Sequence, residues 1–393
     1  MFERTVKFSE LVNDSLLEVG AGRPRSVTYP LPILKVADVL DGKIEASFQG
    51  DFPDISQQGL GPKVSRAGDI ILTVKGTVGR VAIMPPEGPQ FAYSPQLCYF
   101  RPSADSPLNS RYLYYWFKSA DFWNQADALK SQTDMADFLS LSDVCSLKIQ
   151  LPSLKQQAGV SDVLGALDDK IAVNERITAK ADELSASIFK QAQLESPDQF
   201  SEQALSETAE FINGRAFTKD ATGNGRMVVR IAEINSGPSG STVYNKIEVP
   251  EKHLARPGDV LFAWSGSLTV ARWFRPEAII NQHIFKCVPK NGNHHWIINQ
   301  LIHRKIDEFR AIAADKATTM GHIQRRHLDE PVQVPNPAML QRLDTQISPL
   351  WGRALCAEQE SLSLATLRDT LLPQLMSGRL RVRDAEKIVE DHA

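Results

Sequence analysis

The fold of this chain is decided by two short strings of residues that occur twice in the same order. The first string reads KVADVLDG at residues 35–42 and RIAEINSG at residues 230–237. The second reads AGDIIL at residues 67–72 and PGDVLF at residues 257–262. Each Gly-Asp pair opens an apolar run with the length of a buried strand. We therefore expect two modules of similar structure.

The duplication continues along the chain. TDM at residues 133–135 corresponds to TTM at residues 318–320, and LP at residues 151–152 corresponds to VP at residues 334–335. The offset between the copies slides from 195 residues through 190 and 185 to 183, as insertions and deletions in surface loops would make it do. Two copies are too few for a solenoid, which needs about three or more units. A duplicated module suits a target with two similar halves.

Each module is followed by the pattern of a long helix. Apolar residues between Ser153 and Gln193, and again between residues 337 and 376, recur at alternating spacings of three and four. Helices with such stripes pack on each other as coiled coils do, and we expect an antiparallel pair. The alternative is that each helix docks only on its own module, but helices of globular domains usually run about 8–20 residues. The residues expected to form the pairing and partner-docking stripes are Val160, Leu164, Leu167, Ile171, Ile177, Leu184, Ile188, Leu340, Leu343, Ile347, Leu350, Leu364, Leu371 and Leu375.

The domain organisation follows from these patterns. Short β-runs broken by turn residues predict an α+β fold, with curved, mostly antiparallel sheets and peripheral helices. The 393 residues allow two or three domains of about 150 residues each. We expect a first module at 1–150, a long helix at 151–196, a second module at 197–335, and a second long helix with a tail at 336–393.

Composition limits the classes of function. The formal net charge is −3, with 44 Lys and Arg against 47 Asp and Glu, so the chain does not bind nucleic acid through a general positive charge. Any DNA binding must use local patches or a partner that contacts phosphates. The four cysteines show no C-x-x-C spacing, which indicates a reduced, cytoplasmic protein without a thiolate metal site. No apolar run approaches the roughly 18 residues that predict a membrane span.

Motifs for catalysis and cofactor binding are missing. The sequence has no Asn/Asp-Pro-Pro-aromatic motif of DNA methyltransferases and no P-loop string; MPPE at residues 84–87 lacks the amide or carboxylate before the prolines. The histidines at 294, 295 and 303 are better explained by a solvated helix start than by a metal site. Asp168 and Asp169 point about 100° apart on a helix, so they predict a solvated face or a partner contact. We expect no catalytic residue, no metal and no cofactor bound by this chain.

Recognition of DNA remains as a function for the turns. GTVGR at residues 76–80 and GSLT at residues 266–269 combine small and hydroxyl residues with nearby basic ones, and such loops can approach phosphates. The alternative is a purely structural β-turn. Amide and imidazole side chains that follow strands could contact base edges. The candidate DNA-binding residues are Lys63, Arg66, Lys75, Thr77, Arg80, Gln96, Arg101, Ser265, Ser267, Arg272, Asn281, Gln282, His283, Arg325 and Arg326.

Several strings together resemble one protein family. FINGRAF at residues 211–217, followed by the two repeated strings, resembles the start of a target-recognition domain in the specificity (S) subunit of type I restriction-modification systems. LPSLKQQ at 151–157 running into LGALDDKIAVN at 164–174 is similar to that family's central helix, and LATLRDTLLPQLMSG at 364–378 to its C-terminal helix. The resemblance covers essentially the whole chain. The first module departs from it at its opening, which reads LEVGAGR at 17–23 without the Asn-Gly-Arg-Ala-Phe string.

The resemblance implies a function and a set of partners. Each recognition domain would read one half of a bipartite, asymmetric site in double-stranded DNA, and the paired helices would set the spacing and dock two modification subunits. S-adenosylmethionine, ATP and Mg would be bound by partner subunits, including a restriction subunit where the system also cleaves DNA. The alternative from another class is a coiled-coil interaction scaffold whose β modules bind protein rather than DNA.

Overall fold

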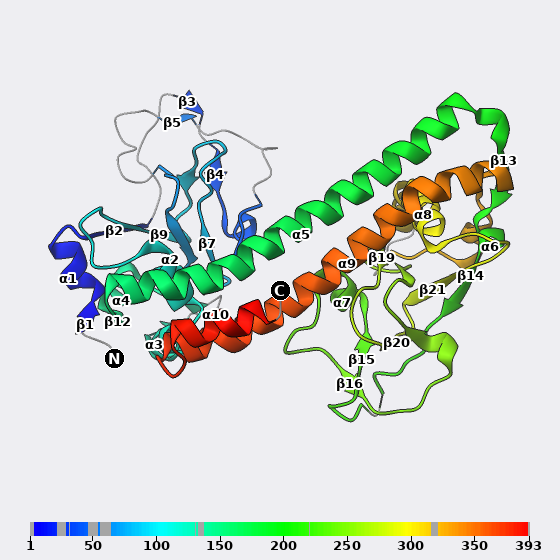
Figure 1. Cartoon of the computed structure of the whole chain (residues 1–393). Coiled ribbons are helices and arrows are strands. Elements are labelled where there is room, and N and C mark those ends of the chain that lie inside the picture. Colours follow the sequence, from blue (N-terminus) through cyan, green and yellow to red (C-terminus); the bar gives the residue numbers. More distant parts are fainter. Residues whose placement is uncertain are drawn as a thin grey trace. The chain divides into compact units, whose positions relative to one another are not determined.

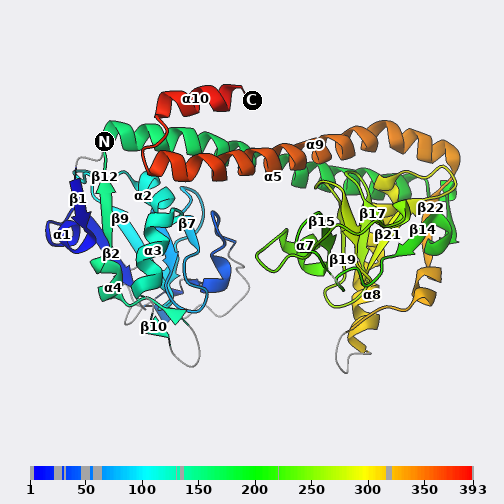
Figure 2. The same ribbon diagram turned by 90° about the horizontal axis from the view of Figure 1, so that it is seen from below.

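The structure, a computed structural model, describes residues 4–21, 29–30, 32–45, 54–55, 64–129, 131–132, 137–219, 221–315 and 321–391 (Figures 1 and 2). Candidate Lys63 and the strings at 133–135 and 318–320 lie outside these residues. The chain divides into two compact units, Met1–Asp169 with Ala365–Ala393, and Lys170–Leu364. Each long helix contributes residues to both units, and each unit is described by itself.

The first unit is built on an antiparallel four-stranded sheet with smaller strand pairs around it (Figure 1). The main sheet has the order β2 (Leu17–Ala21), β9 (Leu97–Pro102), β6 (Ile70–Thr73) and β7 (Val81–Ile83). The pairs are β1 (Arg4–Lys7) with β12 (Lys148–Leu151), β3 (Tyr29–Pro30) with β5 (Asp54–Ile55), β4 (Ile33–Leu34) with β8 (Ala92–Tyr93) in parallel, and β10 (Ser131–Gln132) with β11 (Asp137–Phe138). The helices that belong to this unit alone are α1 (Phe8–Asn13), η1 (Val36–Asp38), α2 (Ser110–Phe117), α3 (Ala120–Leu129), α4 (Leu141–Ser146) and α10 (Val382–Glu390).

The second unit repeats this plan. Its main sheet has the order β14 (Ala209–Asn213), β21 (Ile284–Pro289), β18 (Val260–Ala263) and β19 (Thr269–Arg272). A second sheet has the order β16 (Tyr244–Asn245), β15 (Arg226–Val229), β20 (Ala278–Ile280) and β17 (Leu254–Ala255), and β13 (Phe200–Ala204) pairs with β22 (Pro331–Pro335). The helices are α6 (Leu205–Thr208), α7 (Ile231–Ser236), α8 (His295–Asp315), η4 (Pro197–Gln199), η5 (Glu251–His253) and η6 (Arg325–Asp329).

The two modules share the topology of the main sheet and of the outer strand pair. The order β14-β21-β18-β19 matches β2-β9-β6-β7, and the outer pair β13-β22 matches β1-β12. Even the parallel pairing recurs, because β15 runs parallel to β20 as β4 runs parallel to β8. The α+β fold with two similar modules, predicted from the repeated strings, is confirmed.

The Gly-Asp string builds the same turn in both modules. Gly68 and Gly258 have φ of +82° and +94°, a conformation that favours glycine. The Gly68 N–H donates to the Met84 carbonyl at 2.9 Å, as the Gly258 N–H does to the Trp273 carbonyl at 2.7 Å. The Asp carboxylate then accepts from a backbone N–H three residues earlier, in Asp69 at 2.8 Å and in Asp259 at 2.7 Å. The string therefore starts the central strand in each module.

The core of each module lies against its main sheet. In the first, α2 buries six consecutive residues from Tyr112 to Phe117, and Phe117 packs against Phe100 and Phe122 with ring centroids 4.7 and 5.1 Å apart. In the second, one apolar cluster joins the strands and α8 to residues of both long helices, including Phe189 and Ile347. The second module is thus packed on both long helices through its apolar core.

The two long helices are α5 (Leu154–Glu195) and α9 (Pro337–Met376), and they pair antiparallel. Within the second unit, the Asn174 amide donates to Glu360 at 2.8 Å and the Thr178 hydroxyl donates to the Ala354 carbonyl at 3.4 Å. Residue numbers therefore rise along one helix as they fall along the other. Within the first unit, Arg368 pairs with Asp168 at 2.7 Å, and α10 lies against the first turns of α5, where Val382 approaches Gly159 (Figure 2).

The side chains of the expected stripe are mostly covered. Val160, Leu164, Leu167, Leu343, Ile347, Leu364, Leu371 and Leu375 are buried, and Ile171, Ile177, Ile188, Leu340 and Leu350 are half-buried. The structure differs from the expectation at Leu184, whose side chain is 49% exposed while its neighbour Ser185 is buried. The middle of the pair is made of small residues, including Ala181, Ala354 and Ala357. Such residues let helices approach closely. The buried positions of α5 continue from Leu167 through Asn174 and Ala181 at a spacing of seven residues and include Ser185, so Leu184 lies beside this stripe and is exposed.

Charged groups attach each module to the helices. In the second unit, the Arg272 guanidinium contacts Glu358 at 2.8 Å and Asp182 at 3.3 Å and lies 4.4 Å from the Trp351 ring centroid. Its side chain is only 4% exposed. In the first unit, the Asp168 carboxylate on α5 accepts from the Tyr115 hydroxyl at 2.6 Å while it pairs with Arg368. Asp168, expected on a solvated face or at a partner contact, instead joins α2, α5 and α9.

We predict that Arg272→Ala destabilises the protein by roughly 3–5 kcal/mol, because it leaves the half-buried carboxylate of Glu358 without its cation. Burial already raises the pKa of Glu358 above its ordinary value. Denaturant unfolding measures the change. Lys180→Ala on α5 is the control, since the Lys180–Glu183 pair is exposed and should contribute less than about 1 kcal/mol. Equal effects of the two substitutions would contradict the prediction.

We also predict that His253 makes stability depend on pH. The residue is 3% exposed, and neither nitrogen of its ring has a hydrogen-bond partner among the described residues. Burial, and then the positive charges of Arg215 and Lys252, lower its pKa below the ordinary 6.5. The unfolded chain therefore takes up the proton first, so stability present above about pH 6.5 is lost as the pH falls. His253→Phe should show a smaller fall in melting temperature between about pH 7.5 and about pH 5.5 than the unsubstituted protein. An unchanged fall would show that other groups cause it.

Candidate functional site

The described parts of the chain offer little for catalysis. No group of three or more His, Cys, Asp or Glu side chains among them could hold a metal ion. Burial raises the pKa of the Cys98 and Cys287 thiols, so neither is a thiolate nucleophile at neutral pH. No helix within the same residues combines the length and apolar character needed to cross a membrane.

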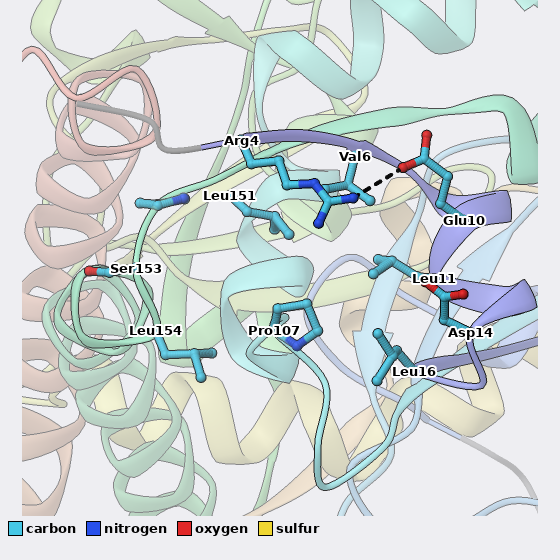
Figure 3. A pocket seen from close by; sticks show the side chains of 11 residues that line it. Arg4, Val6, Glu10, Leu11, Asp14, Leu16, Pro107, Leu151, Ser153 and Leu154 are labelled. Atoms are coloured by element: carbon cyan, nitrogen blue, oxygen red, sulfur yellow. Dashed lines mark ion pairs between the residues drawn. The ribbon is translucent and has the colours of Figure 1, made fainter.

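A small pocket lies beside β1 and the start of α5 in the first unit (Figure 3). Its volume is about 250 Å³, and its apolar lining includes Leu11, Pro107 and Leu154. Its charged lining residues are Arg4, Glu10 and Asp14, and Arg4 and Glu10 form an ion pair at 3.7 Å. The lining contains no His or Cys. This pocket has no arrangement typical of an active site.

The candidate recognition residues gather instead on loops at the ends of the main-sheet strands. In the first module, the Val74 N–H donates to the Gln96 carbonyl at 2.9 Å, and the Val74 carbonyl accepts from the Leu139 N–H at 2.8 Å. Lys75 forms a β-bridge with Phe138. We call these three backbone contacts the loop frame.

The second module has the same loop frame. The Trp264 N–H donates to the His283 carbonyl at 3.2 Å, the Trp264 carbonyl accepts from the Ile323 N–H at 3.1 Å, and Ser265 forms a β-bridge with His322. Five positions therefore correspond between the modules, counting the last residues of β2 and β14. They are Ala21 and Asn213, Val74 and Trp264, Lys75 and Ser265, Gln96 and His283, and Phe138 and His322. The backbone is the same, and the side chains differ at every one of these positions.

In the first module, the hydroxyl of Thr73 fixes the backbone of the loop that follows β6. Thr73 donates to the Thr77 carbonyl at 2.5 Å and accepts from the Arg80 N–H at 2.9 Å. Candidates Lys75 and Thr77 are exposed, as are Gln96 at the frame and Arg66 in the Gly-Asp turn, while Arg80 is half-buried. The turn thus presents hydroxyl and cationic groups outward.

The loop of the second module carries an aromatic and polar cluster. The Trp264 ring centroid lies 5.5 Å from that of His283 and 6.4 Å from that of His322, and the Trp264 indole N–H donates to Asn213 Oδ1 at 3.0 Å. Ser265 Oγ lies 3.3 Å from His283 Nδ1. Candidates Ser265, Gln282 and His283 meet here, and exposed Ser267 accepts from the Asn235 amide at 2.9 Å.

Other candidates have structural partners. Arg101 contacts Asp69 at 2.6 Å and Glu18 at 3.1 Å. Arg272 forms its ion pairs with carboxylates of the long helices. Asn281 is 6% exposed, and Arg325, although exposed, donates to the Phe211 carbonyl at 3.3 Å. Arg326 is exposed. The guanidinium groups of Arg101 and Arg272 face carboxylates because burial of an arginine requires a paired anion.

The Asn-Gly-Arg string has a structural explanation. A Cβ built on Gly214 would lie 2.1 Å from the Asn281 carbonyl oxygen, so only glycine lets this segment cross the end of β20. Arg215 pairs in a β-bridge with Asn281, and its side chain is exposed. Sequence reasoning did not select Asn213, Trp264, Arg215 or His322. Aligning the two copies residue by residue would have paired Trp264 with Val74 and drawn attention to it.

Comparison with known proteins agrees with this architecture. Residues 61–183 match the family model described as the type I restriction modification DNA specificity domain. The chain is 22% identical over 316 residues to the type I restriction enzyme MjaIX specificity subunit of Methanocaldococcus jannaschii, covering 70% of each chain. Its structure resembles the type I restriction-modification system S subunit from M. genitalium, with a TM-score of 0.55 at 15% identity over 95% of this chain and 96% of that chain. It also matches the HsdS subunit from Thermoanaerobacter tengcongensis at 19% identity over 96% and 97% of the two chains, with a TM-score of 0.36.

The family match covers part of the first module and of α5, and the likeness of fold extends over nearly the whole chain. The second module repeats the topology and the loop frame of the first. Together with the duplicated strings, these findings show that the chain resembles type I restriction-modification specificity subunits in sequence and in fold.

Proposed function

We propose that this chain selects the DNA sequence for a type I restriction-modification complex, with each module reading one half of a bipartite, asymmetric site. The observation that carries the proposal is the loop frame, which is kept in both modules while the side chains on it differ. A shared backbone would present each set of side chains to DNA in the same way, and different side chains would select different bases. The contact residues proposed are Arg66, Lys75, Thr77, Arg80 and Gln96 in the first module, and Ser267, Gln282, His283 and Arg326 in the second. Candidate Ser265 is only 4% exposed and contacts His283 instead.

The net charge of the chain is consistent with DNA binding that is shared between this chain and partner subunits. A formal net charge of −3 leaves phosphate neutralisation to local groups such as Lys75 and to partner subunits. We propose that two modification subunits dock on the long helices and bring S-adenosylmethionine, and that ATP and Mg act on a restriction subunit where one is present. The chain itself would act in the cytoplasm without catalytic chemistry of its own.

An exchange of modules tests whether each module reads one half of the DNA site. Replacing residues 197–335 with the corresponding segment of another specificity subunit should change one half of the methylated sequence and leave the other half intact. Methylation-aware sequencing of DNA modified by the assembled complex reads both halves at once. A complex that changes both halves together would contradict the assignment of one module to one half-site. A protein-binding scaffold would yield no sequence-specific methylation to exchange.

A second prediction concerns the spacing between the half-sites. Inserting four residues after Asn174 adds about 6 Å to α5, which is close to two base pairs of DNA at roughly 3.4 Å each. Four residues are also nearly one helical turn of about 3.6 residues, so the apolar stripe is largely kept. The unspecified gap in the methylated sequence should lengthen while both half-sites stay the same.

The matched control is a four-residue insertion after Gly240, which is exposed in a loop with open space around it. This control should leave the gap unchanged. If the insertion after Asn174 yields a folded, active complex with the original gap, the long helices do not set the spacing.

A further inference from the structure

Asn213 ends strand β14 at the loop frame of the second module, and its side chain is exposed. Its Oδ1 accepts the hydrogen bond from the Trp264 indole N–H at 3.0 Å. An indole nitrogen only donates, whereas an asparagine amide has one accepting oxygen and one donating NH₂ group. The contact therefore decides how the amide is turned. The oxygen faces Trp264, and the two N–H groups face away from it.

Trp264 is itself held firmly enough to impose this orientation. Its backbone N–H and carbonyl are both hydrogen-bonded in the loop frame. Its ring packs beside those of His283 and Phe285, with centroids 5.5 and 5.8 Å away. A ring with neighbours on several sides has few rotamers open to it. The direction of its N–H is thus set by the fold.

The first module does not contain this pair. Ala21 and Val74 occupy the corresponding positions, and Val74 is 5% exposed. Neither side chain can donate or accept a hydrogen bond. The pair is therefore specific to the second module although the backbone around it is shared. A residue that distinguishes one half-site from the other would show this distribution.

We infer that Asn213, oriented by Trp264, is a specificity determinant of the second module and presents N–H donors to a hydrogen-bond acceptor on a base edge. This inference rests on the proposed function. In the major groove, guanine offers N7 and O6, adenine offers N7 and thymine offers O4 as acceptors, whereas cytosine offers only its N4 donor. Asn213 thus excludes cytosine at the position it contacts, and Trp264 is its positioning residue.

Two variants of the chain, each assembled with its modification subunits, test the inference by methylation-aware sequencing. Asn213→Asp keeps the shape of the side chain but replaces the donors with an acceptor. At one position of the second half-site, preference should shift to a base that presents a donor, cytosine or adenine. Trp264→Phe keeps a ring but removes the indole N–H, so the amide can turn over. Discrimination at the same position should fall on the order of tenfold, the effect of one hydrogen bond. The first half-site stays unchanged in both.

Asn291→Asp is the matched control, because it makes the same change of charge on an exposed asparagine of the same module. The Asn291 amide donates to the Glu207 carbonyl at 3.2 Å, just before β14 begins, whereas Asn213 ends that strand. The methylated sequence should be unaffected. If Asn213→Asp abolishes methylation, Asn213→Ala, which adds no charge, is used in its place. Loss of discrimination at one position of the second half-site then supports the inference, and unchanged discrimination contradicts it.

Unchanged discrimination in both Trp264→Phe and the Asn213 variants overturns the inference, as does a change confined to the first half-site. These results leave the proposed function standing, because the unsubstituted complex would still methylate a bipartite site. A complex without any sequence-specific methylation would instead refute the proposed function itself.

Discussion

A carboxylate at the start of the central strand, fully buried in the first module and half-buried in the second, is the constraint on which each module depends. Asp69 is fully buried and pairs with Arg101, and Asp259 pairs with Lys286 at 2.9 Å. The same carboxylates close the Gly-Asp turn from which β6 and β18 begin. The other ends of these two strands lead into the loop frame. A buried ion pair is costly to break on one side, so the turn holds the strand in register, and the strand in turn positions the loop that would meet DNA.

The loop frame keeps the backbone geometry of the two modules the same while their side chains differ. Main-chain hydrogen bonds at Val74 and at Trp264 are equivalent, and they place no demand on the side chains. Lys75 and Ser265, or Gln96 and His283, can therefore differ freely without a change of fold. This arrangement would let a duplicated module serve the two different half-sites that we propose, and it allows a polar cluster such as that around Trp264 to arise in only one module.

The long helices are attached to both modules through charged groups, and to the second module also through its apolar core. Arg272 joins β19 to carboxylates on both helices, and Asp168 joins α2 to Arg368 on α9. Ion pairs shielded from water allow few alternative geometries, since each requires its partner at hydrogen-bond distance. The modules are thereby fixed to the surface that partner subunits are proposed to use.

The sequence by itself determined the duplication, the α+β class, the two long helices and the resemblance to specificity subunits, because repeated strings and periodic spacing are local properties of the chain. It also predicted that the loops after β6 and β18 carry recognition residues. Only the tertiary structure decided which side chains remain free for that task. Arg101 and Arg272 resemble exposed cations in the sequence, yet each forms ion pairs with carboxylates from distant segments of the chain. Trp264 and Asn213 lie 51 residues apart and meet only because β14 and β18 both pair with β21. Side-chain direction depends on such pairing, which no local pattern contains.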